Sequence, residues 1–282
     1  MKSKITTGIV ANDAGGAELL SSYILTKSNS NYLYFLKGPA KKIFNKKINK
    51  IVLENNLNKF ISRVDKLICA SSFKLNFELR AIKIAKEKKI KSIVFLDHWV
   101  NYKMRHIMKG KLVLPDIFWV TDKHAKLIAN TEFPKKKIIV KRNYYLDSFK
   151  KIKLKNIFKK NSILYICDPK RKKNVKYSEL ESINYLIKNL EKITNENVKI
   201  TIRPHPSETK KKYQQLSKHK MISISENNTL LQDIAKNEII VGAGSMAMLV
   251  ASLFRKKIYC SMPPHGKSFI PNIKKIKYLS SL

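Results

Sequence analysis

The feature that most limits the fold is a regular alternation between short apolar runs, rich in β-branched residues, and longer stretches with helical periodicity. In the first half of the chain, the runs with the length and composition of strands cover 6–12, 31–37, 66–71, 91–97, 116–122 and 137–143. Helical patterns lie between them, most clearly over 14–25 and 73–88. Short runs that are apolar throughout are typical of strands covered on both faces. The alternation predicts a parallel α/β architecture.

A second series of the same kind follows a basic stretch, residues 144–161, that lacks long apolar runs. Its predicted strands cover 162–168, 198–204, 221–225, 238–244 and 256–262, and its predicted helices cover 178–193, 207–218, 229–237 and 245–254. We expect two Rossmann-like, doubly wound domains, residues 1–145 and 161–282, with a linker over 146–160. A ligand would bind in a cleft between them, at the carboxyl ends of the strands. A single large sheet is the alternative.

Positive charge is the most unusual property of the composition. The chain has 58 Lys and Arg residues against 20 Asp and Glu residues, a formal net charge of +38. This balance favours nucleic acid, anionic lipid or phosphorylated substrates as partners. Most of the basic residues are lysines, and Ile and Asn are also frequent, as an AT-rich genome produces by codon drift. Because a guanidinium matches phosphate and carboxylate geometry, Arg142 and Arg203 receive more weight than the dispersed lysines.

The cysteines and the hydropathy pattern indicate a cellular compartment. Cys69, Cys167 and Cys260 lie far apart, and each ends or follows an apolar run. They are interpreted as buried thiols in a reducing compartment, because their spacing fits neither a disulfide framework nor a zinc site. No signal-peptide pattern precedes the first predicted strand, and no apolar run approaches the roughly 18 residues that span a bilayer. We expect a cytoplasmic protein whose membrane contact, if any, is peripheral.

The segment "TIRPHPSETK", residues 201–210, ends a predicted strand with a stiff basic elbow. Two prolines fix the backbone around Arg203 and His205. Ser207 can then cap the next helix, whose N-terminal amides attract an anion. An arginine, a histidine and a helix N-terminus at the carboxyl end of a strand predict a phosphate site. The alternative is that the prolines only end the strand.

The segment "VGAGSMAMLV", residues 241–250, offers a second set of phosphate ligands. Gly242 and Gly244 permit a tight turn from strand to helix and a close backbone approach. Ser245 is placed at the N-cap, where its hydroxyl and the amides of Met246 and Ala247 can contact phosphate oxygens. The segment lacks the third glycine of the dinucleotide-binding fingerprint. We therefore interpret it as one of two elements, with the elbow, that hold a phosphate.

Two segments of the first half could contribute side chains to the cleft. Asp13 follows the first strand, and Gly15 and Gly16 permit the turn into the next helix; Asp13 could instead simply cap that helix. Asp97 and His98 end a buried strand, although His98 could equally be a core-edge histidine. Just beyond, three residues could stack on or hydrogen-bond a sugar: Trp99, Asn101 and Tyr102.

Weaker candidates also follow strands. Asp122 and His124 come after the strand over 116–122, but Asp122 can act as a simple helix cap. Lys170 and Arg171 follow the first strand of the second half, where a solvated charge run is the simpler interpretation.

Together these motifs resemble the donor domain of GT-B-type transferases, above all bacterial sialyltransferases and polysialyltransferases and the CDP-glycerol glycerophosphotransferases of wall and capsule synthesis. The resemblance covers roughly residues 160–262 by motif and the rest by architecture. It is carried by an R-x-HP-x-E motif and a serine turn: Arg203, His205, Pro206 and Glu208, then Gly244, Ser245 and Ala247.

The resemblance implies an assignment of roles. The second domain would bind a CMP-, CDP- or UDP-linked donor through Arg203, His205, Ser245 and the Met246 amide, and the first would bind a glycan acceptor. Asp97 would be the general base, with Asp13 as its rival. No D-x-D pair is present, so the expected reaction uses no metal and no cofactor, only protein cations and helix dipoles.

The sequence departs from this pattern at three places. The serine pair is Gly244-Ser245, which leaves one hydroxyl. The acidic motif of the sialyltransferase-like enzymes has a second acid and a glycine that are absent beside Asp97. The last predicted strand is followed by only about twenty residues, so we expect the closing helices of the family to be short or missing.

Other functions remain open. A nucleotide-sugar 2-epimerase shares this architecture but would want further acids and histidines in the cleft. A nucleic-acid-binding or polyanion-binding protein would use the charge of +38, yet no aromatic-interleaved basic motif or zinc finger is present. A non-catalytic carbohydrate-binding protein would fit a degenerate serine motif. The leading hypothesis is a transferase acting on a surface-polysaccharide acceptor.

Overall fold

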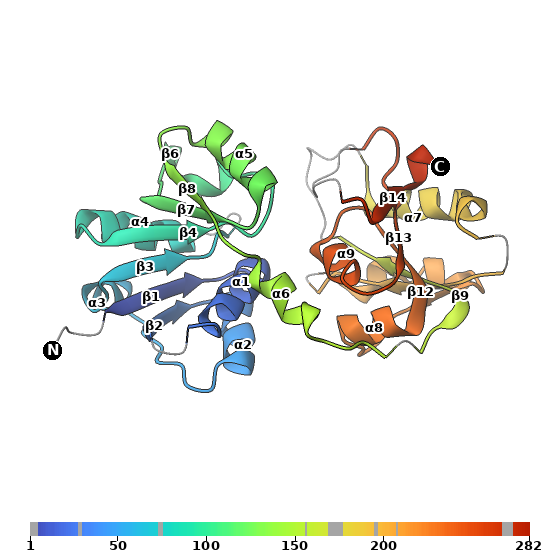
Figure 1. Ribbon diagram of the computed structural model, residues 1–282, viewed down its shortest axis with the longest axis horizontal. Coiled ribbons are helices and arrows are strands. Elements are labelled where there is room, and N and C mark those ends of the chain that lie inside the picture. The colour runs from blue at the N-terminus through green and yellow to red at the C-terminus, as the bar shows by residue number, and fades with distance from the viewer. Residues whose placement is uncertain are drawn as a thin grey trace. The chain divides into compact units, whose positions relative to one another are not determined.

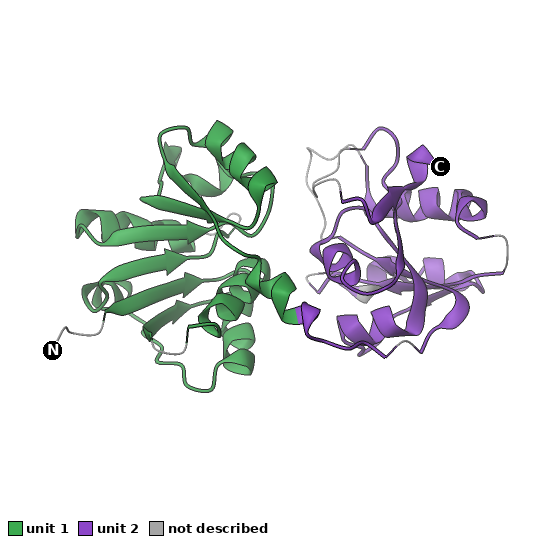
Figure 2. Ribbon diagram, in the orientation of Figure 1, with its two compact units in different colours: residues 1–148 green, residues 149–282 purple. Residues whose placement is uncertain are grey.

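The computed structural model describes residues 5–27, 30–72, 76–155, 157–168, 177–194, 197–206, 208–266 and 273–282. The chain divides into two compact units, residues 1–148 and 149–282, each built around a sheet of its own (Figure 2).

Unit 1 is built on a parallel sheet of six strands in the order β2-β1-β3-β4-β7-β8 (Figure 1). The chain runs outward from β1 to β2, then crosses to β3 on the other side of β1 and continues through β4 and β7 to β8. Because all these pairings are parallel, the carboxyl ends of the strands lie at one edge. The strands are β1 (Thr6–Ala11), β2 (Asn31–Leu36), β3 (Lys66–Cys69), β4 (Lys91–Phe95), β7 (Ile117–Val120) and β8 (Lys137–Val140).

Helices cover both faces of this sheet. Side chains of α1 and α2 share one core cluster with Ile9 and Ala11 of β1, whereas Gly8, on the opposite face of that strand, lies against Phe60 of α3. The helices are α1 (Ala14–Ile24), α2 (Gly38–Lys47), α3 (Leu57–Ser62), α4 (Phe77–Glu87), α5 (Lys123–Glu132) and α6 (Tyr144–Lys150). A 3-10 turn η1 (Met104–His106) leads into a small antiparallel hairpin of β5 (Ile107–Met108) and β6 (Lys111–Leu112).

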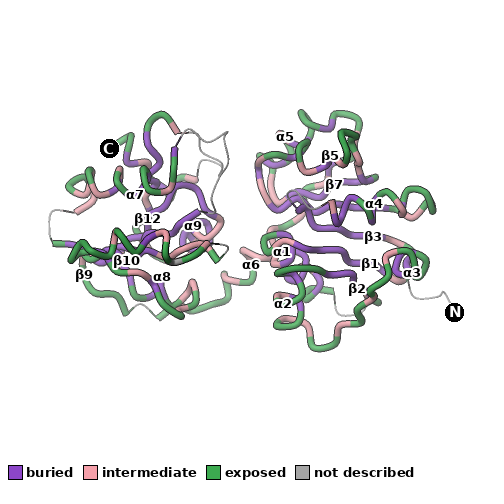
Figure 3. The backbone as a smooth tube through the Cα atoms, turned by 180° about the vertical axis from the view of Figure 1, so that it is seen from behind, coloured by how far each residue is buried: buried purple, intermediate pink, exposed green. Residues whose placement is uncertain are grey.

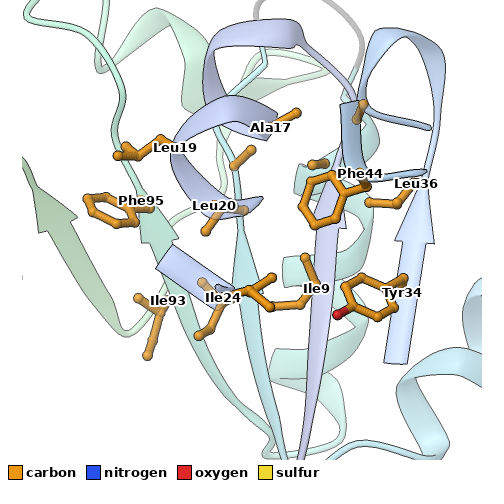
Figure 4. Packing of buried hydrophobic residues seen from close by; sticks show 14 of the residues in the cluster. Ile9, Ala17, Leu19, Leu20, Ile24, Tyr34, Leu36, Phe44, Ile93 and Phe95 are labelled. Carbon is orange, nitrogen blue, oxygen red and sulfur yellow. The ribbon is translucent and has the colours of Figure 1, made fainter. Parts of the chain in front are cut away.

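The core beneath α1 follows from helical spacing. Ala17, Leu20 and Ile24 recur every three or four residues, so they lie on one face of the helix. Figure 4 shows this face against Ile9 of β1 and Phe95 of β4. In both units the central strands are buried along most of their length, whereas the connections are mostly exposed (Figure 3).

Unit 2 repeats the architecture with the order β11-β10-β9-β12-β13-β14, again entirely parallel. The order reverses between β9 and β12. The strands are β9 (Lys159–Ile166), β10 (Lys199–Arg203), β11 (Ile222–Ile224), β12 (Asn237–Gly242), β13 (Lys257–Cys260) and β14 (Ile276–Tyr278). The helices are α7 (Glu179–Lys188), α8 (Leu230–Lys236) and α9 (Met246–Ala251), with 3-10 turns η2 (Leu190–Lys192), η3 (Lys210–Tyr213), η4 (Leu216–Lys218) and η5 (Leu279–Ser281).

The predicted class, two Rossmann-like doubly wound domains, is confirmed, and the single large sheet is excluded. The helix predicted over 207–218 is wrong: the described part, 208–218, contains only the two short turns η3 and η4. Helix α6 and the first residues of β9 lie within the stretch 144–161 that was predicted to be a plain connection. Ser207, Lys170 and Arg171 lie outside the described residues.

Cys69, Cys167 and Cys260 are buried thiols, as the sequence predicted. Burial raises the pKa of Cys69 and Cys167, and the carboxyl groups of Glu78 and Glu179 raise them further. Within the part of the chain that the structure describes, no helix has the length and hydropathy to cross a bilayer.

Leu20 within α1 and Leu25, the C-cap residue just after it, provide a matched stability test. Leu20 is fully buried and Leu25 is 58% exposed. Leu20→Ala should lower the free energy of unfolding by about 2–5 kcal/mol, because it leaves a cavity in the core. Leu25→Ala should change it by less than about 0.5 kcal/mol. Urea unfolding of both variants gives the comparison, and equal losses would contradict this packing.

Candidate functional site

In unit 1, the loops after β1, β3 and β4 meet where the strand order reverses. Ligands of open α/β sheets bind outside the carboxyl ends of the strands at such a point. Asp13 follows β1, Ser71 follows β3 and Asp97 follows β4. The topology therefore brings together two acids that are 84 residues apart in the sequence, counting 97 minus 13.

Asp97 is buried at this edge. Its side chain is only 6% exposed, and Oδ1 accepts a hydrogen bond from Ser71 Oγ at 3.2 Å. Arg105 Nη1 lies 3.8 Å from the same oxygen and donates to the Ser71 carbonyl at 2.7 Å. One carboxylate oxygen is thus fixed by a hydroxyl and a cation, which orients the other.

The second oxygen of Asp97 faces His98. His98 Nε2 lies 3.4 Å from Asp97 Oδ2, and the imidazole side chain is 40% exposed while the carboxylate is buried. The histidine is therefore the member of the pair that reaches solvent. An imidazole backed by a carboxylate can accept a proton from a substrate and keep the resulting charge paired.

Two glycines bring the first turn of α1 against this pair. A Cβ atom on Gly15 would lie 2.4 Å from Asp97 Oδ2, and one on Gly16 would lie 2.6 Å from the Cβ atom of Ala70. Neither glycine has the positive φ angle that a tight turn would demand. The prediction that they permit a turn is corrected: they permit close approach.

Asp13 lies at the same edge of the sheet, in the loop between β1 and α1. It occupies the N-cap position of α1, but its carboxylate makes no cap hydrogen bond. It accepts a hydrogen bond from the Asn12 side-chain amide at 2.6 Å. The simple capping interpretation is therefore wrong, and Asp13 stays a candidate base.

Glu78 is a functional candidate that sequence reasoning missed. It is 3% exposed, and its Oε1 accepts from the Asn12 amide at 3.0 Å and from Ser72 Oγ at 2.5 Å. Burial raises its pKa to about 7, and the charge of Asp13 contributes. The available signal was an acid on the apolar face of a predicted helix, with Ile82 and Ala85 at i+4 and i+7.

The aromatic residues after Asp97 correct the prediction of a sugar-stacking surface. Trp99 is 7% exposed, and its indole donates to Asp122 Oδ2 at 2.8 Å. Tyr102 is 1% exposed, and its hydroxyl donates to the His98 carbonyl. Both are enclosed because they anchor the segment after β4, whereas Asn101 is exposed with a φ angle of +60°.

The weaker candidate Asp122 is a helix cap: its Oδ1 accepts from the Ala125 amide at 2.7 Å. His124 lies exposed at the start of α5. Arg142 is 74% exposed and pairs with Asp147 at 2.8 Å, so it belongs to the surface of unit 1.

In unit 2, the carboxyl ends of β9, β10 and β12 lie side by side, with Arg203 and Gly242 both in register with Ile166. Arg203 donates to the Asn228 carbonyl at 2.9 Å and pairs with the buried carboxylate of Asp233. That carboxylate also accepts from Ser225 Oγ at 2.6 Å. Arg203 therefore has a structural partner beside the predicted phosphate site.

Other residues of the elbow, residues 201–210, also form hydrogen bonds within unit 2. His205 is half-buried, and its carbonyl accepts from the Glu208 amide at 2.9 Å. The Glu208 carboxylate accepts from the Tyr213 hydroxyl at 2.5 Å and from Lys212 at 3.0 Å. Pro206 is exposed. Glu208 thus holds the loop after β10, and the imidazole of His205 stays the candidate donor ligand.

The glycine-serine turn has the expected cap. Ser245 is the N-cap of α9, and its Oγ accepts from the Ala247 amide at 3.2 Å. Gly244 has a φ angle of +147°, which favours glycine, and Met246 begins the helix. A Cβ atom on Gly242 would lie 2.8 Å from the Ile166 carbonyl, so this glycine serves strand packing.

A second missed acid, Glu179, lies at the carboxyl end of β9. Its carboxyl oxygens accept from the Tyr165 hydroxyl at 2.8 Å and from the Asp168 amide at 3.2 Å. Burial, then the nearby charge of Asp168, raises its pKa to about 7. Among the described residues, no group of three or more His, Cys, Asp or Glu side chains is placed to hold a metal ion.

No protein-family model matches the sequence, and no curated protein matches it. Solved structures do match. UDP-GlcNAc 2-epimerase from Methanocaldococcus jannaschii gives a TM-score of 0.60 at 15% identity over 91% of this chain and 83% of its own. The Neisseria meningitidis UDP-GlcNAc 2-epimerase bound to UDP-GlcNAc gives 0.58 at 12% identity, over 86% and 79%. MurG from Acinetobacter baumannii gives 0.51 at 10% identity, over 99% and 86%. At these identities the likeness shows the GT-B fold.

The pKa of Glu179 makes a prediction about stability and pH. The unfolded chain releases this proton near pH 4.5 and the folded protein near pH 7, so ionisation destabilises unit 2 as the pH rises between these values. The free energy of unfolding of Glu179→Gln, relative to that of the wild type, should therefore increase by about 2–3 kcal/mol from pH 5 to pH 8. Urea unfolding at both pH values measures this. The exposed Glu226→Gln is the control, and an equal gain there would refute the assignment.

Proposed function

We propose that the protein is a GT-B transferase that passes a sugar or polyol phosphate from a nucleotide-activated donor to a glycan or surface-polysaccharide acceptor. The observation that carries the proposal is the Asp97–His98 pair: a buried, oriented carboxylate at the reversal point of the sheet, with an exposed imidazole beside it. The GT-B fold supports it as context, because this architecture serves nucleotide-sugar chemistry in the solved structures that match.

The proposed reaction begins with the acceptor hydroxyl. His98 takes its proton while Asp97 stabilises the imidazolium that forms. The hydroxyl oxygen attacks the donor's anomeric carbon, or its phosphorus for a polyol phosphate, and the bond to the nucleotide phosphate breaks. The nucleotide leaves with the bonding electrons. Asp13, in the loop between β1 and α1, is the second candidate base.

In unit 2, His205, Ser245 and the amide of Met246 would bind the donor phosphate. Arg203 contributes its charge while paired with Asp233, so its removal should damage the fold as well as binding. The donor is a substrate, and no other cofactor is proposed. Protein cations and backbone amides would stabilise the leaving phosphate in place of a metal.

A 2-epimerase is the second candidate, favoured by the 2-epimerase structures with TM-scores of 0.60 and 0.58. Inversion at carbon 2 of a sugar breaks and re-forms its C–H bond. An epimerase would therefore introduce deuterium from D₂O into UDP-GlcNAc without any acceptor, whereas a transferase would not.

The roles of the two units can be separated by mutation. Asp97→Asn should leave nucleotide binding intact and lower acceptor-dependent nucleotide release by about 10²–10⁴-fold, because His98 loses the carboxylate that stabilises its protonated form. His205→Ala should instead abolish the thermal shift produced by the matching CMP, CDP or UDP conjugate. Glu87→Gln, an exposed change in α4, is the control. Absence of any nucleotide-induced shift in the intact protein would overturn the proposal.

In unit 1, which would bind the acceptor, the β5–β6 hairpin has a surface suited to an anionic membrane. We propose that it makes a peripheral membrane contact. Ile107 and Leu112 pair across the β5–β6 hairpin, so they share one face, and they are 42% and 46% exposed. Met104 is 52% exposed nearby. Residues 101–115 contain four Lys or Arg residues and no acid. Exposed apolar side chains in a segment with three exposed lysines suit an anionic bilayer, and a second copy of so basic a chain would be repelled.

Vesicle sedimentation tests this contact. Binding to vesicles with 30% phosphatidylglycerol should fall at least tenfold in Ile107→Ser/Leu112→Ser, because less apolar surface enters the interface. Salt should weaken wild-type binding, because each lysine near the surface contributes about 1 kcal/mol. Val52→Ser, 57% exposed on another part of unit 1, is the control. Equal binding by all three proteins would exclude the hairpin.

A further inference from the structure

We infer that Glu78 is a positioning residue for the site in unit 1: it holds the backbone of the β1–α1 loop so that the first turn of α1 stays against Asp97. The inference rests on the proposed function for its catalytic consequence, but its structural part can be measured without turnover.

The evidence begins with a chain of hydrogen bonds. The Asn12 amide donates to Glu78 Oε1 at 3.0 Å, and Ser72 Oγ donates to the same oxygen at 2.5 Å. Ser72 Oγ in turn accepts from the Asp13 amide at 3.3 Å. Two consecutive backbone amides after β1 are therefore bound, directly and through one hydroxyl, by a side chain from α4.

This loop sets the distance between α1 and the acid. Gly15 comes two residues after Asp13, and a Cβ atom there would lie 2.4 Å from Asp97 Oδ2. The packing is therefore so close that a displacement of the loop by about 1 Å would alter the surroundings of the Asp97–His98 pair. Misplacements of this size are enough to slow a positioned reaction about 10²-fold.

The packing of α4 does not by itself require a glutamate at this position. Its neighbours on the buried face of α4 are apolar: Leu79, Ile82 and Ala85. An apolar residue would complete that face, yet it would leave the Asn12 backbone amide and the Ser72 hydroxyl without this acceptor, and with it the hydroxyl that holds the Asp13 amide. The residue type is therefore required by the loop, not by the core.

The charges around Glu78 determine how it responds to pH. Asp13 faces Glu78 from the β1–α1 loop, and Cys69 faces it from β3. Arg105 and His106 of η1 line, together with Glu78, a cavity of about 10 Å³. Burial keeps the Cys69 thiol protonated by raising its pKa, and lowers the pKa of His106 to about 4. The pKa of Glu78, about 7, thus places its own ionisation in the neutral range.

Ionisation should loosen the loop. Burial raises the pKa of Glu78, so the ionised carboxylate is more stable in water than in this site, and an opening that exposes Glu78 becomes easier once it ionises. Protection of the Asn12 and Asp13 amides should therefore fall as the pH rises from about 5 to about 7, after correction for intrinsic exchange.

Amide hydrogen exchange of the segment 9–19 in the full-length protein tests the inference. Glu78→Leu should accelerate exchange at least tenfold and lower kcat at least tenfold with little change in donor binding. Glu78→Gln, which keeps an acceptor oxygen, should restore most of both and abolish the pH dependence of exchange. Glu87→Leu, on the exposed face of the same helix, should change neither.

The outcomes separate the two proposals. Unchanged exchange in Glu78→Leu overturns the positioning role whatever the activity. Faster exchange with unchanged kcat also overturns it, because the loop would then not matter to the reaction. If Glu78→Leu does not fold, pH-dependent exchange in Glu78→Gln like that of the wild type overturns it. Failure of the wild type to turn over any donor rejects the proposed function, while the exchange result still decides the role of Glu78 in the loop.

Discussion

Parallel pairing on both sides of a central strand is the constraint on which the rest of each unit depends. β1 is bonded to β2 and β3, and β9 to β10 and β12, so the chain must leave each central strand and return on its other side. Parallel strands force every loop that follows a strand to the same edge. Asp13, Ser71 and Asp97 meet in unit 1, and the loops that follow Ile166 and Gly242 meet in unit 2, for this reason.

Both units use the same device at that edge, a glutamate that binds the backbone just after the central strand. Glu78 accepts from the amide of the first residue after β1, and Glu179 accepts from the amide of the second residue after β9. Each begins an apolar helical stripe: Glu78 precedes Ile82 and Glu179 precedes Ile183, in both cases by four residues. In both, burial raises the pKa to about 7. A carboxyl group is long enough to reach a loop from a helix and is the natural acceptor for an unpaired amide.

The sequence predicted two domains and, of the strands in the two six-stranded sheets, all but the edge strand β14, because a buried parallel strand is a short apolar run that can be recognised without its partner. It placed Asp97 and His98 at the end of β4 correctly for the same reason. It failed where specific side-chain hydrogen bonds determine the local structure. Trp99 and Tyr102 were expected at a surface, but their polar atoms find Asp122 and the His98 carbonyl. Likewise, helical propensity could not reveal that the segment after β10 is held by Glu208 and breaks into short turns.

The scarcity of acids explains why buried acids, the predicted Asp97 as well as the missed Glu78, are informative residues. With 58 basic and 20 acidic residues, a lysine can occupy almost any exposed position at little cost, but a buried acid must be held by specific donors. Asp97, Glu78 and Asp233 are each buried with at least one donor within hydrogen-bonding distance. Arginines seemed the better guide because guanidinium groups suit phosphates, yet Arg203 is paired with one of these acids. In so basic a chain, the buried acids mark where the fold needs an acceptor, and the edge of unit 1 has two of them, Asp97 and Glu78.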